Sequence, residues 1–232
     1  MKGRLTASSS SNDVQEFFSD LAITDDPFLN QADKRRSGRL PEFLKSNNRS
    51  HVAYKEVRYH GILPNLIRRS PTTKLCLIVR HPCAVIHSWL QAPREFRADL
   101  EWTASEEWRY ALKKNLNRSE EYNGYERWKE ATLLFHDLAS RHPKSVSLVY
   151  YHDLVANTYA ETKKLFTHCG INLDIQTKQF LDQSTSSEND DAYSVYRKSK
   201  RDDQWRAGLD ASIVDAIKLD VQASSLAPFF EF

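Results

Sequence analysis

The sequence predicts a soluble α/β fold of three layers, in which a mostly parallel sheet carries helices on both faces. Short continuous apolar runs are typical of strands buried in a parallel sheet, and amphipathic segments separate them. The chain has 232 residues, 40% of them hydrophobic and 28% charged, which suits one domain with a substantial core. Four consecutive serines fall within residues 1–12, so we expect a disordered tail there and a single domain over residues 13–232.

Strands and helices are expected to alternate along the chain. The predicted strands cover residues 51–57, 74–79 and 145–151, and the predicted helices cover residues 13–23, 39–46, 61–69, 82–92, 119–142 and 157–170. Pro82 suits the first position of its helix, where the missing N–H forfeits no hydrogen bond. Asn117 followed by Glu120 predicts the start of the long helix, and Gly170 predicts the end of the last one. Residues 183–192 are polar and are expected to form a loop.

Charge, hydropathy and cysteine content argue against several classes of protein. A formal net charge of +2 and a pI near 8.3 give no basis for nucleic-acid binding. The sequence has no run of 18 apolar residues and no signal-peptide pattern, so we expect a cytoplasmic protein without a membrane span. Cys76, Cys83 and Cys169 form no CxxC pair, and we interpret them as small buried residues in a reducing compartment rather than as zinc ligands.

The main functional signal lies where the run 74–79 meets the next helix. Ligands bind at the carboxyl ends of the strands in an open parallel sheet, and a helix that begins there favours an anion. Arg80 adds a guanidinium that can grip a phosphate with two hydrogen bonds. Ser88 lies about 9 Å along the helix from Pro82 and adds a hydroxyl. These residues alone leave two interpretations open: a phosphate site, or an Arg80 that pairs locally beside a Ser88 that faces a neighbouring helix.

Three segments of the chain resemble the nucleotide-binding segments of the sulfotransferase family. "VRHPCAVIHSW" is similar to the family's 3′-phosphate-binding segment, with an Arg-to-Ser spacing of eight and with His81 where Asp or Asn is common. "VYYHDLVANTYAETKKLFTHCGI" resembles the strand-Tyr-Glu-Asp-Leu segment, with His152 in place of Glu. "YRKSKRDDQWRAGL" resembles the C-terminal segment that contains Arg-Lys-Gly and then Trp, with Ser199 in place of Gly and Trp205 retained. The resemblance runs from about residue 51 to residue 210.

The resemblance implies the P-loop-NTPase-like sulfotransferase fold and the donor 3′-phosphoadenosine 5′-phosphosulfate, without a metal. It also implies that Arg80, Ser88, Arg197 and Lys198 hold the 3′-phosphate and that Tyr151 lies near the adenosine. The family grips the 5′-phosphosulfate with a glycine-containing loop, because glycine lets backbone N–H groups approach an anion closely. The isolated glycines of this chain match no such loop, so we expect an N-terminally incomplete fold.

The implied reaction is transfer of a sulfuryl group to a hydroxyl or amine of a small-molecule or carbohydrate acceptor. Such an in-line displacement depends on positioning and charge stabilisation, and a base near the acceptor assists it. His60 stands where cytosolic members of the family place a catalytic His, and Glu56 is the alternative base. The aromatic residues between positions 94 and 128 either line an acceptor pocket or pack in the core.

Two other classes of function compete with this prediction. Loss of the donors around the leaving 5′-phosphate would make the chain a non-catalytic or truncated relative that binds 3′-phosphoadenosine nucleotides without turnover. A nucleotide kinase or P-loop ATPase is disfavoured, because the sequence contains no G-x-x-x-x-G-K-[ST] motif. The sequence leaves the acceptor and the oligomeric state open.

Overall fold

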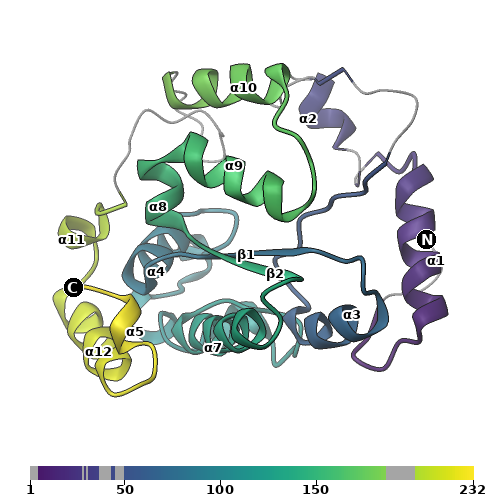
Figure 1. Cartoon of the computed structure of the whole chain (residues 1–232). Coiled ribbons are helices and arrows are strands. Elements are labelled where there is room, and N and C mark those ends of the chain that lie inside the picture. The colour runs from purple at the N-terminus through teal and green to yellow at the C-terminus, as the bar shows by residue number, and fades with distance from the viewer. Residues whose placement is uncertain (1–4, 28, 30, 37–42, 45–49, 187–201) are drawn as a thin grey trace.

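Two parallel strands lie between layers of helices (Figure 1). The computed structural model describes residues 5–27, 29, 31–36, 43–44, 50–186 and 202–232. Strand β1 (Leu75–Val79) pairs with β2 (Val146–Tyr150) so that Val79 lies opposite Tyr150. Parallel strands need a long crossover connection, and the helical segment between β1 and β2 supplies it. The α/β class and the parallel pairing are therefore as predicted.

The predicted strand over residues 51–57 is wrong. This segment has no regular secondary structure and its residues are exposed. The backbone N–H groups of Val57 and Arg58 donate to the Glu56 carboxylate at 2.8 and 2.7 Å instead of to a neighbouring strand. Side-chain acceptors of this kind compete with strand pairing for backbone N–H groups. Within the described residues the sheet consequently has two strands.

Twelve α-helices are described, and five of them correspond to predicted helices. They are α1 (Ser11–Ile23), α2 (Ala32–Arg36), α3 (Leu63–Arg69), α4 (Pro82–Leu90), α5 (Ala104–Glu107), α6 (Leu112–Asn115), α7 (Tyr125–Arg141), α8 (Tyr151–Ala156), α9 (Thr158–His168), α10 (Ile175–Ser186), α11 (Trp205–Gly208) and α12 (Ala211–Gln222). Short 3-10 helices cover His60–Ile62, Ala98–Leu100 and Ala227–Phe229. The predicted helix over 39–46 lies mostly outside the described residues. The predicted loop over 183–192 is helical up to Ser186 and lies outside the described residues thereafter.

Side-chain caps decide where helix α1 begins. The Ser10 side chain accepts a hydrogen bond from the Asp13 N–H, and the Asp13 carboxylate accepts one from the Ser10 N–H. This reciprocal capping box satisfies two backbone donors and starts the helix at Ser11. Leu5 is buried together with Val14. Within the segment predicted as a tail, residues 5–12 therefore supply a cap and a core side chain.

Glycine conformation decides the ends of two other helices. Gly124 precedes α7 with a φ of 83°, and a Cβ there would lie 2.9 Å from the Arg109 carbonyl oxygen. The predicted start near Asn117 is wrong, because the chain turns through left-handed conformations at Leu116 and Asn117 and does not become helical until Tyr125. Gly170, with a φ of 69°, follows the end of α9 as predicted.

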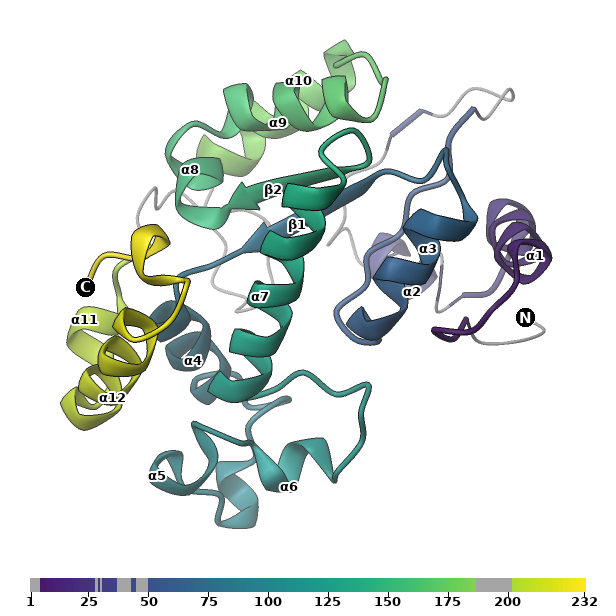
Figure 2. The ribbon, with the colours of Figure 1, turned by 60° about the horizontal axis from the view of Figure 1, so that its bottom comes forward.

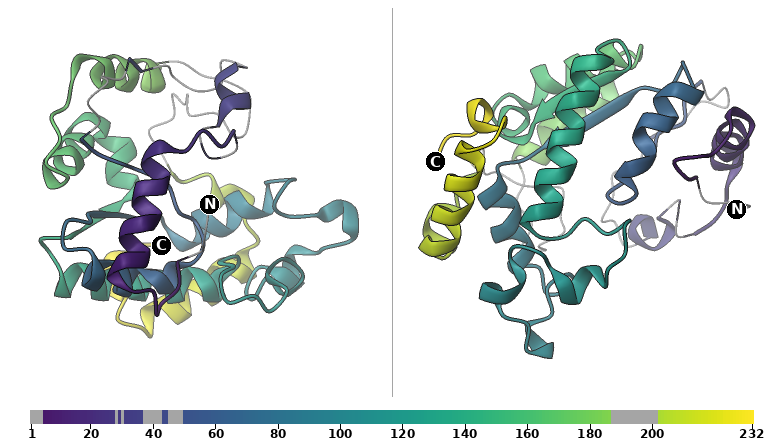
Figure 3. Two further views of the ribbon diagram at one scale, coloured as in Figure 1. Left: turned by 90° about the vertical axis from the view of Figure 1, so that its right-hand side faces the viewer. Right: turned by 90° about the horizontal axis from the view of Figure 1, so that it is seen from below.

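Helices cover both faces of the strand pair, which confirms the predicted three layers. Figure 2 shows α8, α9 and α10 on one side of the strands and α3 and α7 on the other. Helix α4 packs against α7 and α12, and α1 packs against α3. Figure 3 places α1 and α12 at opposite ends of the molecule. None of the described helices combines the length and the apolar character that crossing a membrane requires.

The two faces of β1 differ in burial. Leu77 and Val79 belong to the core, whereas Ile78 is 50% exposed and Cys76 is also exposed. The prediction that this strand is buried on both faces is therefore wrong for the face that carries Cys76. The interpretation of the cysteines as buried residues is confirmed for Cys83 and wrong for Cys76.

The core packing predicts that substitutions at two positions of helix α12 differ strongly in their effect on the free energy of unfolding. Ile217→Ala in α12 should lower the free energy of unfolding by about 2–5 kcal/mol, because it opens a cavity at a fully buried site. Leu219→Ala, in the same helix but 72% exposed, is the matched control and should change it by less than about 0.5 kcal/mol. Urea unfolding of both variants measures the difference, and equal losses would contradict the packing described here.

Candidate functional site

Strand register brings two of the predicted site residues together. Arg80 follows the last residue of β1, Tyr151 follows the last residue of β2, and these last residues are paired. The Arg80 guanidinium carbon lies 5.0 Å from the centroid of the Tyr151 ring. A cation over an aromatic face is attracted by the ring quadrupole, so this contact fixes both side chains at the carboxyl edge of the strands.

The Arg80 guanidinium also binds a carboxylate that comes from far along the chain. Its Nε lies 2.9 and 3.0 Å from the two Asp202 carboxylate oxygens, and its Nη2 lies 2.6 Å from Oδ1. The Asp202 side chain is 8% exposed, whereas that of Arg80 is 32% exposed. The planar guanidinium fork grips a carboxylate in the way that it grips two phosphate oxygens. In the structure the Arg80 fork is therefore engaged by a carboxylate of the same chain.

Sequence reasoning missed Asp202. The sequence feature that could have drawn attention to Asp202 is the acidic pair Asp202–Asp203. This pair directly follows the basic segment ending at Arg201. An acidic pair after a basic run is easily read as a solvated charge cluster. Its partner lies 122 residues away, so the pairing could not be found from local spacing.

His81 caps the helix that follows Arg80. Its Nδ1 accepts a hydrogen bond from the Cys83 N–H at 3.2 Å, and its Nε2 lies 2.9 Å from the Glu231 carbonyl oxygen. This arrangement suits a neutral ring with its proton on Nε2, and burial lowers the His81 pKa. The imidazole thus satisfies one of the backbone donors at the start of α4, as a side-chain N-cap does.

The segment after Asp202 packs directly on this edge. Trp205 is buried and its ring stacks on His81, with centroids 4.6 Å apart and an interplanar angle of 11°. Arg206 in turn lies over the Trp205 ring, 4.4 Å from its centroid. A Cβ on Gly208 would lie 2.3 Å from the His87 Nε2, so the absence of a side chain lets α11 approach α4 closely. Trp205 is thus a packing residue that holds α11 against the edge.

The structure places Ser88 but does not describe the two basic residues of the C-terminal segment. Ser88 is exposed in the second turn of α4, one residue after His87. Burial and then the charge of Arg80 lower the pKa of His87. Arg197 and Lys198 lie outside the described residues. The shared site of Arg80, Ser88, Arg197 and Lys198 stays a prediction.

His60 is held by aromatic packing. Its ring centroid lies 4.4 Å from that of Tyr122 and 5.2 Å from that of Phe135 in α7. Burial lowers the His60 pKa to about 4, and the charge of Glu130 opposes the shift without cancelling it. A base is most effective when its pKa lies near the working pH, so this environment makes His60 a weak base.

The two candidate bases and Arg80 contact different parts of the fold. Trp128 donates its indole N–H to the Arg80 carbonyl oxygen at 3.1 Å, whereas His60 packs on Phe135. Those two positions of α7 are seven residues apart, or about 10 Å along the helix. Glu56 is exposed and accepts hydrogen bonds from its own neighbours. The structure joins Arg80 with Tyr151 and shows no contact of either with His60 or Glu56 among the described residues.

The aromatic residues predicted to line a pocket or pack in the core divide between two environments. Trp128 is buried and stacks on Tyr125, and the Trp108 ring lies 6.0 Å from that of Tyr125. These three rings are therefore packing residues. Tyr110 is exposed, and the Arg109 guanidinium carbon lies 5.6 Å from its ring centroid.

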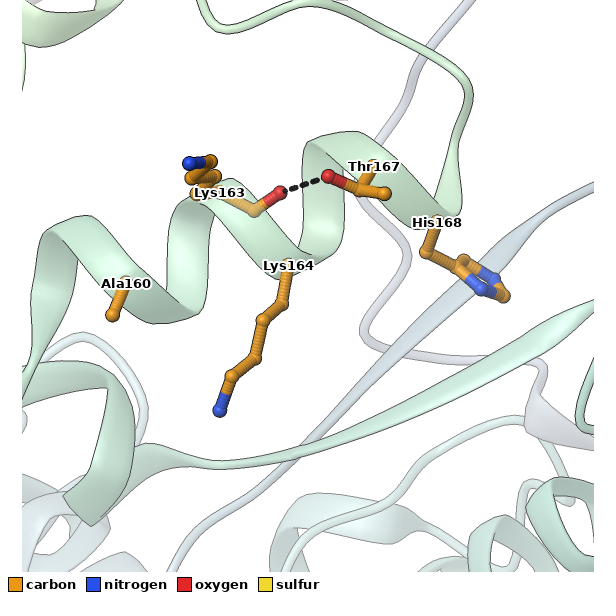
Figure 4. Close-up of a pocket in the computed structure, with 5 residues that line it drawn as sticks. All are labelled: Ala160, Lys163, Lys164, Thr167 and His168. Carbon is orange, nitrogen blue, oxygen red and sulfur yellow. Dashed lines mark hydrogen bonds between the residues drawn. The ribbon is translucent and has the colours of Figure 1, made fainter.

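An open hollow of about 570 Å³ lies along α9 (Figure 4). Its lining residues are Ala160, Lys163, Lys164, Thr167 and His168. The Thr167 hydroxyl donates to the Lys163 carbonyl oxygen at 2.9 Å, and the Lys164 ammonium pairs with Glu161 at 2.5 Å. The lining comes from one helix and includes none of the predicted site residues, so we keep the strand edge as the candidate site.

The fold and the edge define an α/β protein with an arginine, paired with Asp202, at the carboxyl end of a parallel strand. Comparison with known proteins gives the family. A family model described as "Sulfotransferase family" matches residues 5–174, so the chain belongs to the sulfotransferase family. The matched range includes Arg80, Ser88 and Tyr151 and ends before Arg197.

One solved structure is also similar to the chain. It is the crystal structure of mouse sulfotransferase SULT7A1 complexed with PAP, with a TM-score of 0.48 and 15% sequence identity. The similarity covers 74% of this chain and 65% of the mouse chain. No curated protein sequence matches the chain.

Burial of His60 predicts a pH dependence of stability. The folded pKa of about 4 lies below the ordinary value of 6.5, so the unfolded chain binds more protons between these values. The contribution of neutral His60 is complete above pH 6.5 and is lost as the pH falls toward 4. His60→Gln should therefore reduce the loss of stability between pH 7 and pH 5 by up to about 2 kcal/mol.

Urea unfolding at the two pH values measures this difference. His142→Gln changes an exposed histidine and is the matched control for the loss of an imidazole. An identical dependence in the His60→Gln variant would show that His60 is not buried in its neutral form.

Proposed function

We propose that this chain binds 3′-phosphoadenosine 5′-phosphosulfate at the carboxyl edge of β1 and β2 and transfers its sulfuryl group to a hydroxyl or amine. The observation that carries the proposal is the bidentate grip of Arg80 on a carboxylate, next to the Tyr151 ring. A guanidinium in that geometry presents the donors that a 3′-phosphate needs. Family membership supports the same reaction class.

Each remaining binding role rests on the resemblance in the sequence. Tyr151 would lie against the adenosine, and Ser88 would donate its hydroxyl to the 3′-phosphate from the second turn of α4. Arg197 and Lys198 would add positive charge to the same phosphate. The proposal includes no metal, because the arginine and lysine side chains supply the charge that a phosphate requires.

The reaction would proceed by in-line displacement. The acceptor oxygen or nitrogen forms a bond to sulfur while the bond from sulfur to the 5′-phosphate oxygen breaks, and 3′-phosphoadenosine 5′-phosphate leaves. The acceptor loses a proton to a base, for which His60 and Glu56 are the candidates. The low pKa of His60 makes it suited to accept a proton only late in the step, when the acceptor has become acidic.

The acceptor is proposed only as a class, a small molecule or a carbohydrate. A cytoplasmic location is likewise a proposal. Binding without turnover is the alternative function, and one observation favours keeping it. His60, a candidate base, has the pKa of a weak base. An assay of transfer from labelled donor to a panel of sugars, phenols and amines separates the two: transfer supports the enzyme, and nucleotide binding without transfer supports the non-catalytic relative.

Arg80 is the first residue to test. Arg80→Ala should weaken the binding of 3′-phosphoadenosine 5′-phosphate by about 1.5–3 kcal/mol, the scale of hydrogen bonds to charged groups. Isothermal titration calorimetry measures this change. Arg69→Ala, an exposed arginine at the end of α3, is the control and should leave the affinity unchanged. Equal affinity in both variants would refute the role of Arg80.

Asp202 competes with the ligand in this proposal. Asp202→Asn removes the anionic partner of Arg80, so the nucleotide should bind about tenfold more tightly, because a single charge-assisted hydrogen bond is worth about 1.5 kcal/mol or more. Asp203→Asn alters the adjacent exposed carboxylate and is the matched control. Tighter binding by both variants would indicate a general charge effect, and tighter binding by neither would exclude competition at the fork.

A further inference from the structure

Two cysteines from distant parts of the chain lie in contact on the face of the sheet that carries α9. The Sγ atoms of Cys76 in β1 and Cys169 at the C-cap of α9 are 3.7 Å apart, although 93 residues separate them. Both are free thiols, Cys76 is exposed, and Cys169 is half-buried. The proposed function uses neither residue.

Secondary structure holds both thiols in place. Cys76 lies opposite Ser147 in the register of β1 and β2. The Cys169 N–H donates to the Leu165 carbonyl oxygen at 3.0 Å, and the turn continues at Gly170, whose N–H donates to the Thr167 carbonyl oxygen at 3.0 Å. The contact between the sulfurs is therefore set by a strand and a capped helix end, which limits the motion needed to join them.

We propose that Cys76 and Cys169 form a reversible intramolecular disulfide by exchange with a low-molecular-weight disulfide. A protein disulfide has an S–S bond of about 2.05 Å, so the two sulfurs must approach by roughly 1.7 Å from their present contact. Cys83 is fully buried in α4, which leaves it outside this chemistry.

The exchange balances with glutathione disulfide as the oxidant. The Cys76 thiolate attacks one sulfur of glutathione disulfide, and a mixed disulfide forms as one glutathione thiolate leaves. The Cys169 thiolate then attacks the Cys76 sulfur, and the second glutathione thiolate leaves. Two protein thiols lose two electrons, glutathione disulfide gains them, and the two protons pass to the departing glutathione.

The exposure of Cys76 and the environment of its thiol act in opposite directions on the rate of thiol–disulfide exchange. Cys76 is an exposed residue of β1, but desolvation of its thiol and the neighbouring Cys169 raise the pKa of that thiol. Little thiolate is present at neutral pH, so the first exchange step is slow. The closed loop spans the segment from β1 to α9, and cross-linking a loop of that length restricts the unfolded chain.

Peptide mapping of the full chain tests the proposal directly. Trypsin places the three cysteines on three different peptides, residues 75–80, 81–94 and 165–178. The folded chain is incubated at low concentration with excess glutathione disulfide, its remaining thiols are blocked with iodoacetamide, and the digest is read by mass spectrometry without reduction. We expect the 75–80 peptide linked to the 165–178 peptide, the 81–94 peptide alkylated only after unfolding, and loss of the link with dithiothreitol.

Other products would overturn the proposal. The proposal is wrong if Cys76 remains fully alkylatable or if the reaction stops at the mixed disulfide with glutathione. It is also wrong if the disulfide involves the 81–94 peptide or joins two chains. Cys76→Ser and Cys169→Ser should each abolish the linked peptide, and Cys83→Ser, the matched control, should retain it. Oxidation should also raise the melting temperature of the unaltered chain by about 5 °C or more, and reduction should reverse the rise.

Discussion

The register between β1 and β2 is the constraint on which the candidate site depends. Because Val79 lies opposite Tyr150, the residues that follow them leave the sheet at the same level, and Arg80 meets Tyr151. A shift of one residue would send every side chain of one strand to the other face. The apolar face of β1 packed in the core prevents such a shift, so burial of Leu77 and Val79 also fixes the position of the guanidinium.

The environment of Arg80 follows from the need to satisfy a partly buried charge. A guanidinium removed from water requires an anion or acceptor, and Asp202 supplies two oxygens. Aromatic residues hold the neighbouring helices against this edge. Trp205 stacks on His81, and the Trp128 indole N–H donates a hydrogen bond to the Arg80 carbonyl oxygen. An oxyanion ligand would meet a guanidinium that is already oriented, and its binding would exchange one anionic partner for another.

Local patterns predicted the elements that local interactions stabilise. The strands at 74–79 and 145–151 and the helix that begins at Pro82 all form, because apolar runs and a proline at the first helical position are local properties. The predicted strand over 51–57 does not form, because a strand needs a neighbour that the sequence pattern cannot supply. The start of α7 was wrong because the turn at Gly124 depends on a close approach to Arg109.

The sequence alone determined the α/β class, the two strands, five of the helices and the placement of Arg80 and Tyr151 at strand ends, and its motifs indicated the family. The tertiary structure decided that Asp202 occupies the Arg80 fork, that aromatic rings enclose His60, and that Cys76 meets Cys169. The physical reason is the range of the interactions. Periodicity and capping act between residues a few positions apart, whereas ion pairing, burial and thiol contact depend on which distant segments pack together.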